Sequence, residues 1–303
     1  MNLKQNILIL GSEGFIGSNL VKYLHQTYSI FGIDILQQHT NNYTYWHVSG
    51  DNSELASCFA RNRFDFCINV AGSGNVGSSI HHPDIDFRLN VIQTHQVLEA
   101  IRIHQPECQY IHFSSAAVYG DPKHLPISES DEINPLSPYG WHKWHAENLC
   151  KEYDKIYAIP TVILRPFSVY GPGLKKQLFW DIFKKYKDDH DHIELWGTGN
   201  ETRDFIYIKD LCRCVETIMV KGDFNSSIYN IGTGNEISIH RAAASFLMAI
   251  NPGIKIKFNN KTKPGDPLKW KADISKINNL GFTPQYSFDE GILQVIKWIQ
   301  NQN

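Results

Sequence analysis

Residues 6–17 read Asn-Ile-Leu-Ile-Leu-Gly-Ser-Glu-Gly-Phe-Ile-Gly, and this stretch decides the fold. The run 6–10 is apolar and predicts a buried strand. Gly11, Gly14 and Gly17 follow it, at the start of an amphipathic segment that predicts a helix. Glycines at these places allow a tight turn and the close approach of a pyrophosphate, which the positive end of the helix stabilises. The stretch therefore predicts a strand-turn-helix unit that binds a dinucleotide.

A carboxylate stands at the place that selects the cofactor. Asp34 ends the next predicted strand, over 29–33, and lies 17 residues beyond Gly17. A carboxylate there accepts hydrogen bonds from the adenine ribose hydroxyls and repels a 2′-phosphate, so NAD is favoured over NADP. Glu13 would lie beside the pyrophosphate, and we expect its side chain to point into solvent.

Short β-rich runs alternate with longer amphipathic stretches through the first half of the chain. The predicted strands are 6–10, 29–33, 45–48, 65–70, 109–114 and 161–164, and the predicted helices are 15–26, 85–104 and 138–157. This alternation predicts a Rossmann-type doubly wound parallel sheet. After Arg165, prolines and glycines interrupt the pattern around a helix at 177–187, which predicts a smaller C-terminal α/β substrate-binding lobe. We expect an NAD-binding domain over 1–165 and the lobe over 166–303, with 205–232 returning to the first domain.

The composition excludes several classes of protein. The 303 residues suit about two domains, and 29 basic against 31 acidic residues leave a net charge of −2, unlike a general nucleic-acid binder. No apolar run approaches the roughly 18 residues of a membrane span, and the first residues lead into a strand without a secretory leader. Six cysteines without a Cys-x-x-Cys pair indicate reduced thiols. We expect a cytoplasmic protein that contacts neither nucleic acid nor membrane.

Tyr139 and Lys143 are the first candidates for chemistry. Ser137 as N-cap and Pro138 as first helical residue begin the predicted helix, and the two candidates, four residues apart, share one of its faces. A phenol with a reference pKa of about 10 is a base at neutral pH only where its phenolate is stabilised. The Lys143 ammonium, the helix N-terminus and a positively charged nicotinamide ring would each stabilise it.

Ser115 is the candidate for a second group on the reacting hydroxyl. It follows the predicted strand 109–114, and open α/β sheets bind ligands at the carboxyl ends of their strands. His142 and His145 are three residues apart on one helix, but no third ligand is recognisable, so we expect no metal.

The motifs occur in a characteristic order over nearly the whole chain. They are Gly11-x-x-Gly14-x-x-Gly17, Asp34, Ser114-Ser115-Ala116-Ala117-Val118-Tyr119-Gly120, Tyr139-x-x-x-Lys143, Leu164-Arg165-Pro166-Phe167 and Arg203-Asp204-Phe205-Ile206. Together they resemble the extended short-chain dehydrogenase/reductase family, in its NAD-dependent sugar-nucleotide epimerase/dehydratase branch, which includes UDP-glucose 4-epimerases.

The resemblance implies a role for each catalytic candidate. Tyr139 would be the acid/base, Lys143 would bind the nicotinamide ribose and lower the pKa of Tyr139, and Ser115 would hydrogen-bond the reacting sugar oxygen. The residues implied to bind NAD are Gly11, Gly14, Phe15, Ile16, Gly17, Asp34, Asp51, Asn52, Val70, Ala71, Gly72, Asn90, Tyr139, Lys143 and Phe167.

The resemblance also implies a site for a nucleotide-diphosphate sugar, which Ser115 and Tyr139 would contact. Arg203 would bind the diphosphate, and Lys263 stands where relatives usually have a second arginine. Leu195 and Trp196 fall where relatives cradle the nucleobase. Two further substrate contacts are implied. Ser168 occupies a position that is Asn in galactose epimerases, and Trp270 lies where a residue that limits the sugar pocket is expected.

Ala116 and Ala117 stand where dehydratases of this branch carry an acid and a base. Alanine transfers no proton, so dehydration is disfavoured. The pattern favours an NAD-dependent epimerase acting at C4 through a transient 4-keto sugar. A nucleotide-4-keto-sugar reductase and a non-catalytic NAD-binding regulatory protein are the alternatives. Family members commonly dimerise through the helices at 85–104 and 138–157, so we expect a homodimer.

Overall fold

The computed structural model describes residues 4–36, 43–49, 52–189, 191–261 and 265–301. A seven-stranded sheet, all parallel, has the order β11-β6-β5-β4-β1-β2-β3. Its strands are β1 (Asn6–Leu10), β2 (Ser29–Asp34), β3 (Thr44–His47), β4 (Phe66–Asn69), β5 (Gln109–Phe113), β6 (Thr161–Pro166) and β11 (Ser227–Ile231). The strand order reverses between β1 and β4, which confirms the predicted doubly wound sheet.

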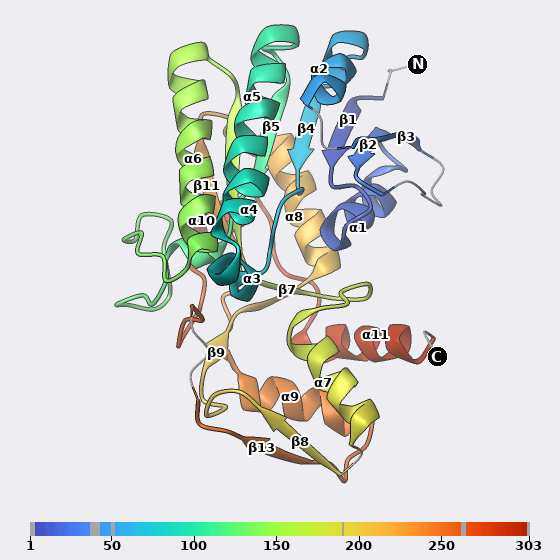
Figure 1. Ribbon diagram of the computed structural model, residues 1–303, viewed down its shortest axis with the longest axis vertical. Helices are drawn as coiled ribbons and strands as arrows, with labels where there is room; N and C mark the ends of the chain where they lie inside the picture. The colour runs from blue at the N-terminus through green and yellow to red at the C-terminus, as the bar shows by residue number, and fades with distance from the viewer. Residues whose placement is uncertain (1–3, 37–42, 50–51, 190, 262–264, 302–303) are drawn as a thin grey trace.

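Helices cover both faces of the sheet (Figure 1). They are α1 (Phe15–Leu24) and α8 (Ile208–Lys221) on one face, and α2 (Asn52–Arg61), α5 (Gln93–His104) and α6 (Pro138–Tyr157) on the other. The sheet is buried on both sides, because the side chains of β1 alternate between two cores. Ile7 and Ile9 pack with α1 and α8, whereas Leu8 and Leu10 pack with α2, α5 and α6.

The predicted helix at 85–104 is divided into three parts. It consists of α4 (Pro83–Phe87), a π-helical turn (Arg88–Ile92) and α5. The wider π turn contains Asn90, and such turns occur frequently at functional sites. A short helix, α3 (Val76–His81), precedes α4 and lies against α6.

The second half of the chain supplies a smaller lobe, at the lower end of Figure 1. Its helices and strands are β7 (Ser168–Tyr170), α7 (Gln177–Asp188), β8 (His192–Leu195), β9 (Thr202–Arg203), β10 (Phe205–Tyr207), β12 (Ile237–Ser238), α9 (Ile239–Met248), β13 (Lys255–Phe258) and α11 (Phe288–Gln300). The short helix α10 (Ser275–Asn279) instead packs on β11 of the main sheet. The strands form the pairs β7–β10, β8–β13 and β9–β12. Within 205–232, α8 packs on α1 and β11 joins the main sheet beside β6. We propose the predicted boundary at 165 as the division between the two parts.

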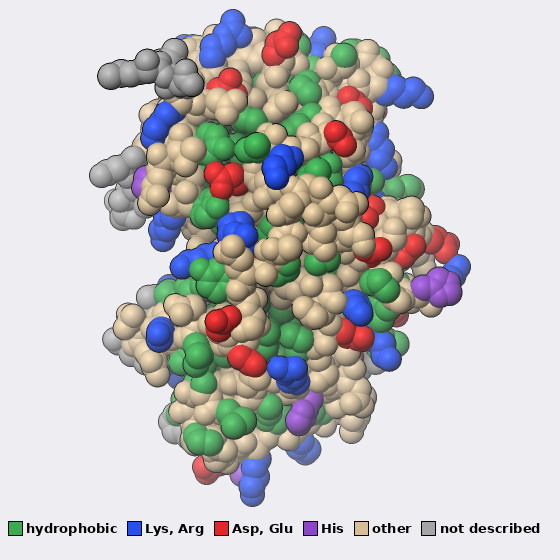
Figure 2. Space-filling model, turned by 180° about the vertical axis from the view of Figure 1, so that it is seen from behind, with side chains coloured by type: hydrophobic (Ala, Val, Ile, Leu, Met, Phe, Trp, Pro, Cys, Tyr) green, Lys and Arg blue, Asp and Glu red, His purple; other side chains and the backbone are tan. Residues whose placement is uncertain are grey.

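The surface and the thiols agree with an ordinary globular protein. Basic and acidic side chains are interspersed on the face seen in Figure 2 rather than gathered by sign. All six cysteines are free and buried. Within the described residues, no helix has the length and apolarity needed to cross a membrane.

Candidate active site

The glycine turn between β1 and α1 is closely packed. Gly11 has a φ of +79°, and a Cβ atom at Gly17 would lie 2.0 Å from the carbonyl oxygen of Gly11. Gly14, which is exposed, is the N-cap of α1 and provides no capping side chain. The first N–H groups of α1 thus have no side-chain cap and can bind an anion, with Phe15 and Ile16 at the start of the helix.

Asp34 lies beside this turn, and its carboxylate helps to shape it. One oxygen accepts from the backbone N–H of Glu13 at 2.9 Å and the other from the N–H of Ile35 at 2.8 Å. The sequence predicted that the side chain of Glu13 points into solvent, and this prediction is wrong. The Tyr43 hydroxyl donates to the Glu13 carboxylate and accepts from the Ser12 hydroxyl at 3.0 Å, so that a residue preceding β3 fixes the acidic side chain.

The segment after β4 lies against the glycine turn at the point where the strand order reverses. A Cβ at Gly11 would lie 2.9 Å from the backbone of Ala71, which follows Val70. Gly72 has a φ of +120°, and a Cβ there would lie 2.7 Å from Oδ1 of Asn90. The Asn90 side chain is buried, and its Oδ1 has no hydrogen-bond partner among the described residues. A buried acceptor of this kind fits a ligand that donates a hydrogen bond.

Two sequence-predicted residues cannot be placed. Asp51 and Lys263 lie outside the described residues. Asn52 is the first residue of α2.

The catalytic candidates meet where β5 ends and α6 begins. The Ser115 hydroxyl accepts from the N–H of Ala117 at 3.1 Å, and it lies close enough to half-buried Tyr139 to lower the pKa of that phenol. Lys143 is buried, its Nζ lies 5.9 Å from the centre of the Tyr139 ring, and it donates to the carbonyl oxygen of Phe113 at 2.9 Å. The structure therefore brings together three residues that the sequence separates by up to 28 positions.

The start of α6 is fixed by two hydroxyl groups. Ser137 accepts from the N–H of Gly140 at 3.2 Å, as predicted for an N-cap. Ser79 of α3, which the sequence did not single out, accepts from the N–H of Tyr139 at 3.1 Å. Ser79 is fully buried and satisfies a backbone donor that the helix leaves unpaired, so it helps to place Tyr139.

The surroundings of Tyr139 raise its pKa overall, whereas the resemblance implies that Lys143 lowers it. Burial raises it to about 12, with a further increase from the Asp86 charge and an opposing decrease from Ser115. Burial lowers the pKa of Lys143 to about 8, against the effects of Asp86 and Glu147. At neutral pH the lysine is therefore charged and the phenol protonated. Formation of the phenolate requires a further positive charge nearby, and the oxidised nicotinamide ring has one.

The sequence also did not indicate a buried polar network that adjoins the catalytic residues. Glu147, one turn beyond Lys143, accepts from Nε and Nη2 of Arg165 at 2.8 and 2.7 Å. It also accepts from the hydroxyl of Ser114 at 2.5 Å, and Arg165 Nη1 donates to the Tyr119 hydroxyl at 2.8 Å. The motif around Arg165 was noted in the sequence, but its partners lie on other elements.

Arg203 and Trp270 lie together in the substrate lobe. The guanidinium carbon is 5.4 Å from the centre of the indole ring, and the indole N–H donates to the carbonyl oxygen of Gly120 at 3.0 Å. Burial lowers the pKa of Arg203, opposed by nearby carboxylates. The indole thus joins the loop after Ser115 to the arginine predicted to bind the diphosphate.

Other predicted contacts differ in what their side chains can reach. Trp196 is 54% exposed, and Ser168, at the start of β7, is half-buried. Leu195 packs into the core of the lobe, and Phe167 packs against Tyr119 and Trp270. The side chains of Leu195 and Phe167 are therefore committed to the core, which leaves mainly their backbone for a ligand.

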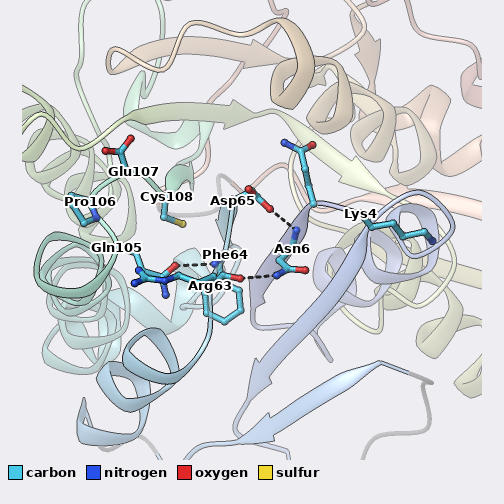
Figure 3. A pocket seen from close by; sticks show the side chains of 10 residues that line it. Lys4, Asn6, Arg63, Phe64, Asp65, Gln105, Pro106, Glu107 and Cys108 are labelled. Carbon is cyan, nitrogen blue, oxygen red and sulfur yellow. Dashed lines mark hydrogen bonds between the residues drawn. The ribbon is translucent and has the colours of Figure 1, made fainter. Parts of the chain in front are cut away.

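A separate cavity lies at the amino ends of the strands, at the opposite end of the sheet from Ser115 and the glycine turn. It has a volume of about 500 Å³, and its lining includes the segments that precede β4 and β5 (Figure 3). The groups lining it bond to one another: Asn6 N–H donates to Asp65 at 2.7 Å, and Phe64 N–H donates to Gln105 at 2.8 Å. Since Ser115 and the glycine turn follow the carboxyl ends of strands, this cavity is distinct from the candidate active site.

A family model described as the NAD dependent epimerase/dehydratase family matches residues 7–232. The chain belongs to this family. A putative UDP-glucose 4-epimerase of Methanocaldococcus jannaschii is 31% identical to it, over 98% of this chain and 99% of the relative. The UDP-glucuronic acid 4-epimerase from Bacillus cereus, solved with UDP-glucuronic acid and NAD, has a TM-score of 0.89 at 30% identity and covers 99% of this chain and 100% of that one. The UDP-N-acetylglucosamine 4-epimerase from Methanobrevibacter ruminantium M1, solved with UDP-N-acetylmuramic acid, has a TM-score of 0.90 at 25% identity, with 99% and 100% coverage.

NAD is the cofactor of this epimerase/dehydratase family member. The geometry fits a dinucleotide, since the crowded turn at Gly11 and Gly17 keeps side chains away from the N-terminus of α1. Asp34 beside that turn suits an adenine ribose, and the unpaired acceptor of Asn90 lies next to Gly72.

Proposed function

We propose that the protein is an NAD-dependent epimerase of a nucleotide-diphosphate sugar, acting at C4 through a transient 4-keto intermediate. The observation that carries the proposal is the meeting of Ser115, Tyr139 and Lys143 at the carboxyl end of β5, in the same parallel sheet whose strand β1 leads into the glycine turn. The similarity to 4-epimerases of UDP-sugars supports the reaction and favours a UDP-sugar as substrate.

Each catalytic side chain has a defined task. Tyr139, once deprotonated, takes the proton of the C4 hydroxyl while Ser115 hydrogen-bonds the same oxygen. Lys143 holds the nicotinamide ribose, and its ammonium favours the phenolate. Bound NAD supplies the acceptance and return of a hydride at the sugar carbon. After the sugar turns its other face to the cofactor, Tyr139 returns the proton to the oxygen, so protons and electrons balance over one turnover.

The turn after Ser115 argues against dehydration. Elimination of water from the sugar needs a second acid and base near the ring, and this turn contains Ala116 and Ala117 instead. Ala116 is fully buried, and the N–H of Ala117 is committed to Ser115. An epimerisation needs no further proton donor.

We propose that the lobe binds the nucleotide diphosphate. Arg203 would bind the diphosphate with help from Lys263, and Trp196 and the backbone of Leu195 would contact the base. Ser168 and Trp270 would line the sugar. The indole N–H of Trp270 donates to Gly120 and its ring lies against Arg203, so these two contacts fix the orientation that the indole would present to the sugar.

We further propose a homodimer formed through α4, the π turn, α5 and α6. Large apolar side chains on these elements are 37–63% exposed, and a second copy of the chain packed on them would remove their apolar surface from water. They are Ile85, Phe87, Leu89, Ile92, Ile103, Trp141, Ile156 and Tyr157. Sedimentation velocity tests the assembly. The six buried free thiols favour a cytoplasmic location.

A panel of nucleotide sugars tests the reaction. The purified protein is incubated with each sugar without added cofactor, and the sugars are separated and identified. We expect one pair of C4 epimers to equilibrate, because the redox equivalents stay with bound NAD. Tyr139→Phe removes one oxygen and should lower kcat at least about 100-fold while leaving NAD affinity unchanged.

Two results would contradict the proposal. A variant that retains more than about a tenth of the wild-type kcat would exclude Tyr139 as the acid/base. Consumption of a 4-keto sugar only with stoichiometric NADH would identify a reductase instead.

A further inference from the structure

Asp86 of α4 forms a buried hydrogen bond with His142 that the proposed reaction does not use. Its Oδ2 lies 2.7 Å from Nδ1 of His142, and the two side chains are 2% and 12% exposed. A carboxylate can only accept, so Nδ1 carries the proton and donates it. The ring of Phe87 packs edge-on against the imidazole at 5.2 Å. The pair therefore joins α4 to the first turns of the catalytic helix.

The second oxygen of Asp86 lacks a compensating contact. Oδ1 is buried and has no hydrogen-bond partner among the described residues. A half-paired carboxylate in a buried place is costly unless a positive charge lies near it. The residue that follows His142 in α6 is Lys143, whose ammonium is also buried. The negative charge of Asp86 acts on both Lys143 and Tyr139.

Asp86 differs from the other carboxylate near this lysine. Glu147 also acts on Lys143, but both of its oxygens accept from the guanidinium of Arg165, a permanent cation. Asp86 shares only one oxygen with an imidazole, which leaves more of its charge uncompensated. The titratable groups that act on Lys143 are Asp86 from α4, Tyr139, Glu147 and Cys150 from α6, and His112 from β5.

Asp86 also contacts the π turn. Its backbone carbonyl accepts from Nδ2 of Asn90 at 3.1 Å, and Asn90 directs its free Oδ1 toward Gly72. One residue thus touches both the catalytic helix and the turn that faces the cofactor site.

We propose that Asp86 is a positioning residue of the active site, whose buried carboxylate is held by His142 and stabilises the ammonium of Lys143 beside Tyr139. The proposal rests on the role of Lys143 in the proposed function. It predicts that neutralising Asp86 makes Lys143 lose its proton at lower pH.

The test follows Lys143 directly. Protein loaded with NAD and labelled with ¹³C at the lysine ε-carbons is titrated by NMR across neutral and mildly alkaline pH, and the Lys143 signal is assigned by its absence in Lys143→Met. We expect Asp86→Asn to lower the Lys143 midpoint by roughly one pH unit, a tenfold change in the ratio of ammonium to amine. Asp86→Ser, which also removes the charge, should do the same and serves if the amide variant does not fold.

Two controls separate charge from structure. Asp84→Asn removes an exposed carboxylate from the same helix and should leave the midpoint in place. His142→Asn keeps an N–H donor for Asp86 and should not lower the titration midpoint of Lys143. An unmoved midpoint in Asp86→Asn, or an equal fall in either control, would overturn the proposal. This experiment measures the protonation of Lys143 and not turnover. If the protein converted none of the nucleotide sugars in the panel, that result would therefore contradict the proposed function and not the proposed role of Asp86.

Discussion

Arg165→Met removes the cation of the most deeply buried ion pair in the described part of the chain. Arg165 and Glu147 are 2% and 0% exposed, and the guanidinium donates twice to the carboxylate and once to Tyr119. Loss of one partner leaves the other charge uncompensated in the interior. Measured losses of this kind are about 3–5 kcal/mol in the free energy of unfolding.

That loss should be visible in thermal unfolding. A change of 1 kcal/mol moves Tm by about 2–4 °C in chains of this general size, so we expect a decrease of roughly 6–20 °C. Glu147→Leu should lower the free energy of unfolding by a similar amount, because it leaves the buried guanidinium of Arg165 without a carboxylate partner. The Ser114 hydroxyl also donates to Glu147, so both changes should disturb the turn that holds Ser115 and lower kcat.

A double-mutant cycle identifies the cause. Guanidinium chloride unfolding with saturating NAD gives the free energies of the two single variants and of Arg165→Met/Glu147→Leu. We expect the double variant to cost clearly less than the sum of the singles, because no buried charge remains. Additive losses, or a single-variant loss below about 1 kcal/mol, would refute the reasoning.

Three shorter predictions concern ligand binding. Gly17→Ala puts a Cβ 2.0 Å from the Gly11 carbonyl oxygen and should lower NAD affinity, measured by calorimetry, at least about tenfold. In the control Gly14→Ala the added Cβ lies 3.2 Å from the same oxygen, so NAD affinity should fall less. Equal losses of affinity in the two variants would contradict the argument from crowding. Asp34→Ala should narrow the preference for NAD over NADP in competition binding, since the carboxylate repels the 2′-phosphate; an unchanged ratio would exclude Asp34 as the selecting residue. Arg203→Ala should weaken UDP-sugar binding by about 1.5–3 kcal/mol with NAD affinity intact, and Arg203→Lys should recover part of it. Failure of UDP, dTDP, GDP and CDP alike to compete with substrate in the wild type would contradict the nucleotide-sugar site.

The sequence by itself determined the features that depend on near neighbours in the chain. The glycine spacing from Gly11 to Gly17 requires a tight turn wherever the unit lies, because the constraint is the missing Cβ. Tyr139 and Lys143 share a face because the helix repeat brings residues four apart together. Alternation of strands with helices likewise predicted the parallel sheet, since parallel neighbours need a crossover between them.

Only the tertiary structure decided which distant residues face one another. Asp86 meets His142, Ser79 meets the N–H of Tyr139, and Tyr43 binds Glu13, although each pair is separated by 30 residues or more. No local pattern marks such pairs, since packing between elements sets their approach. The π turn at Asn90 was hidden for a related reason: its sequence has ordinary helical periodicity, and the structure alone shows the wider turn.

Burial explains the remaining difference. From the sequence, Lys143 was expected to lower the pKa of Tyr139, because their spacing is apparent and their surroundings are not. In the folded protein, burial raises the pKa of Tyr139 to about 12 and lowers that of Lys143 to about 8. The cost of removing a charge from water depends on every neighbouring element, so it is a property of the fold and not of the helix that carries both residues.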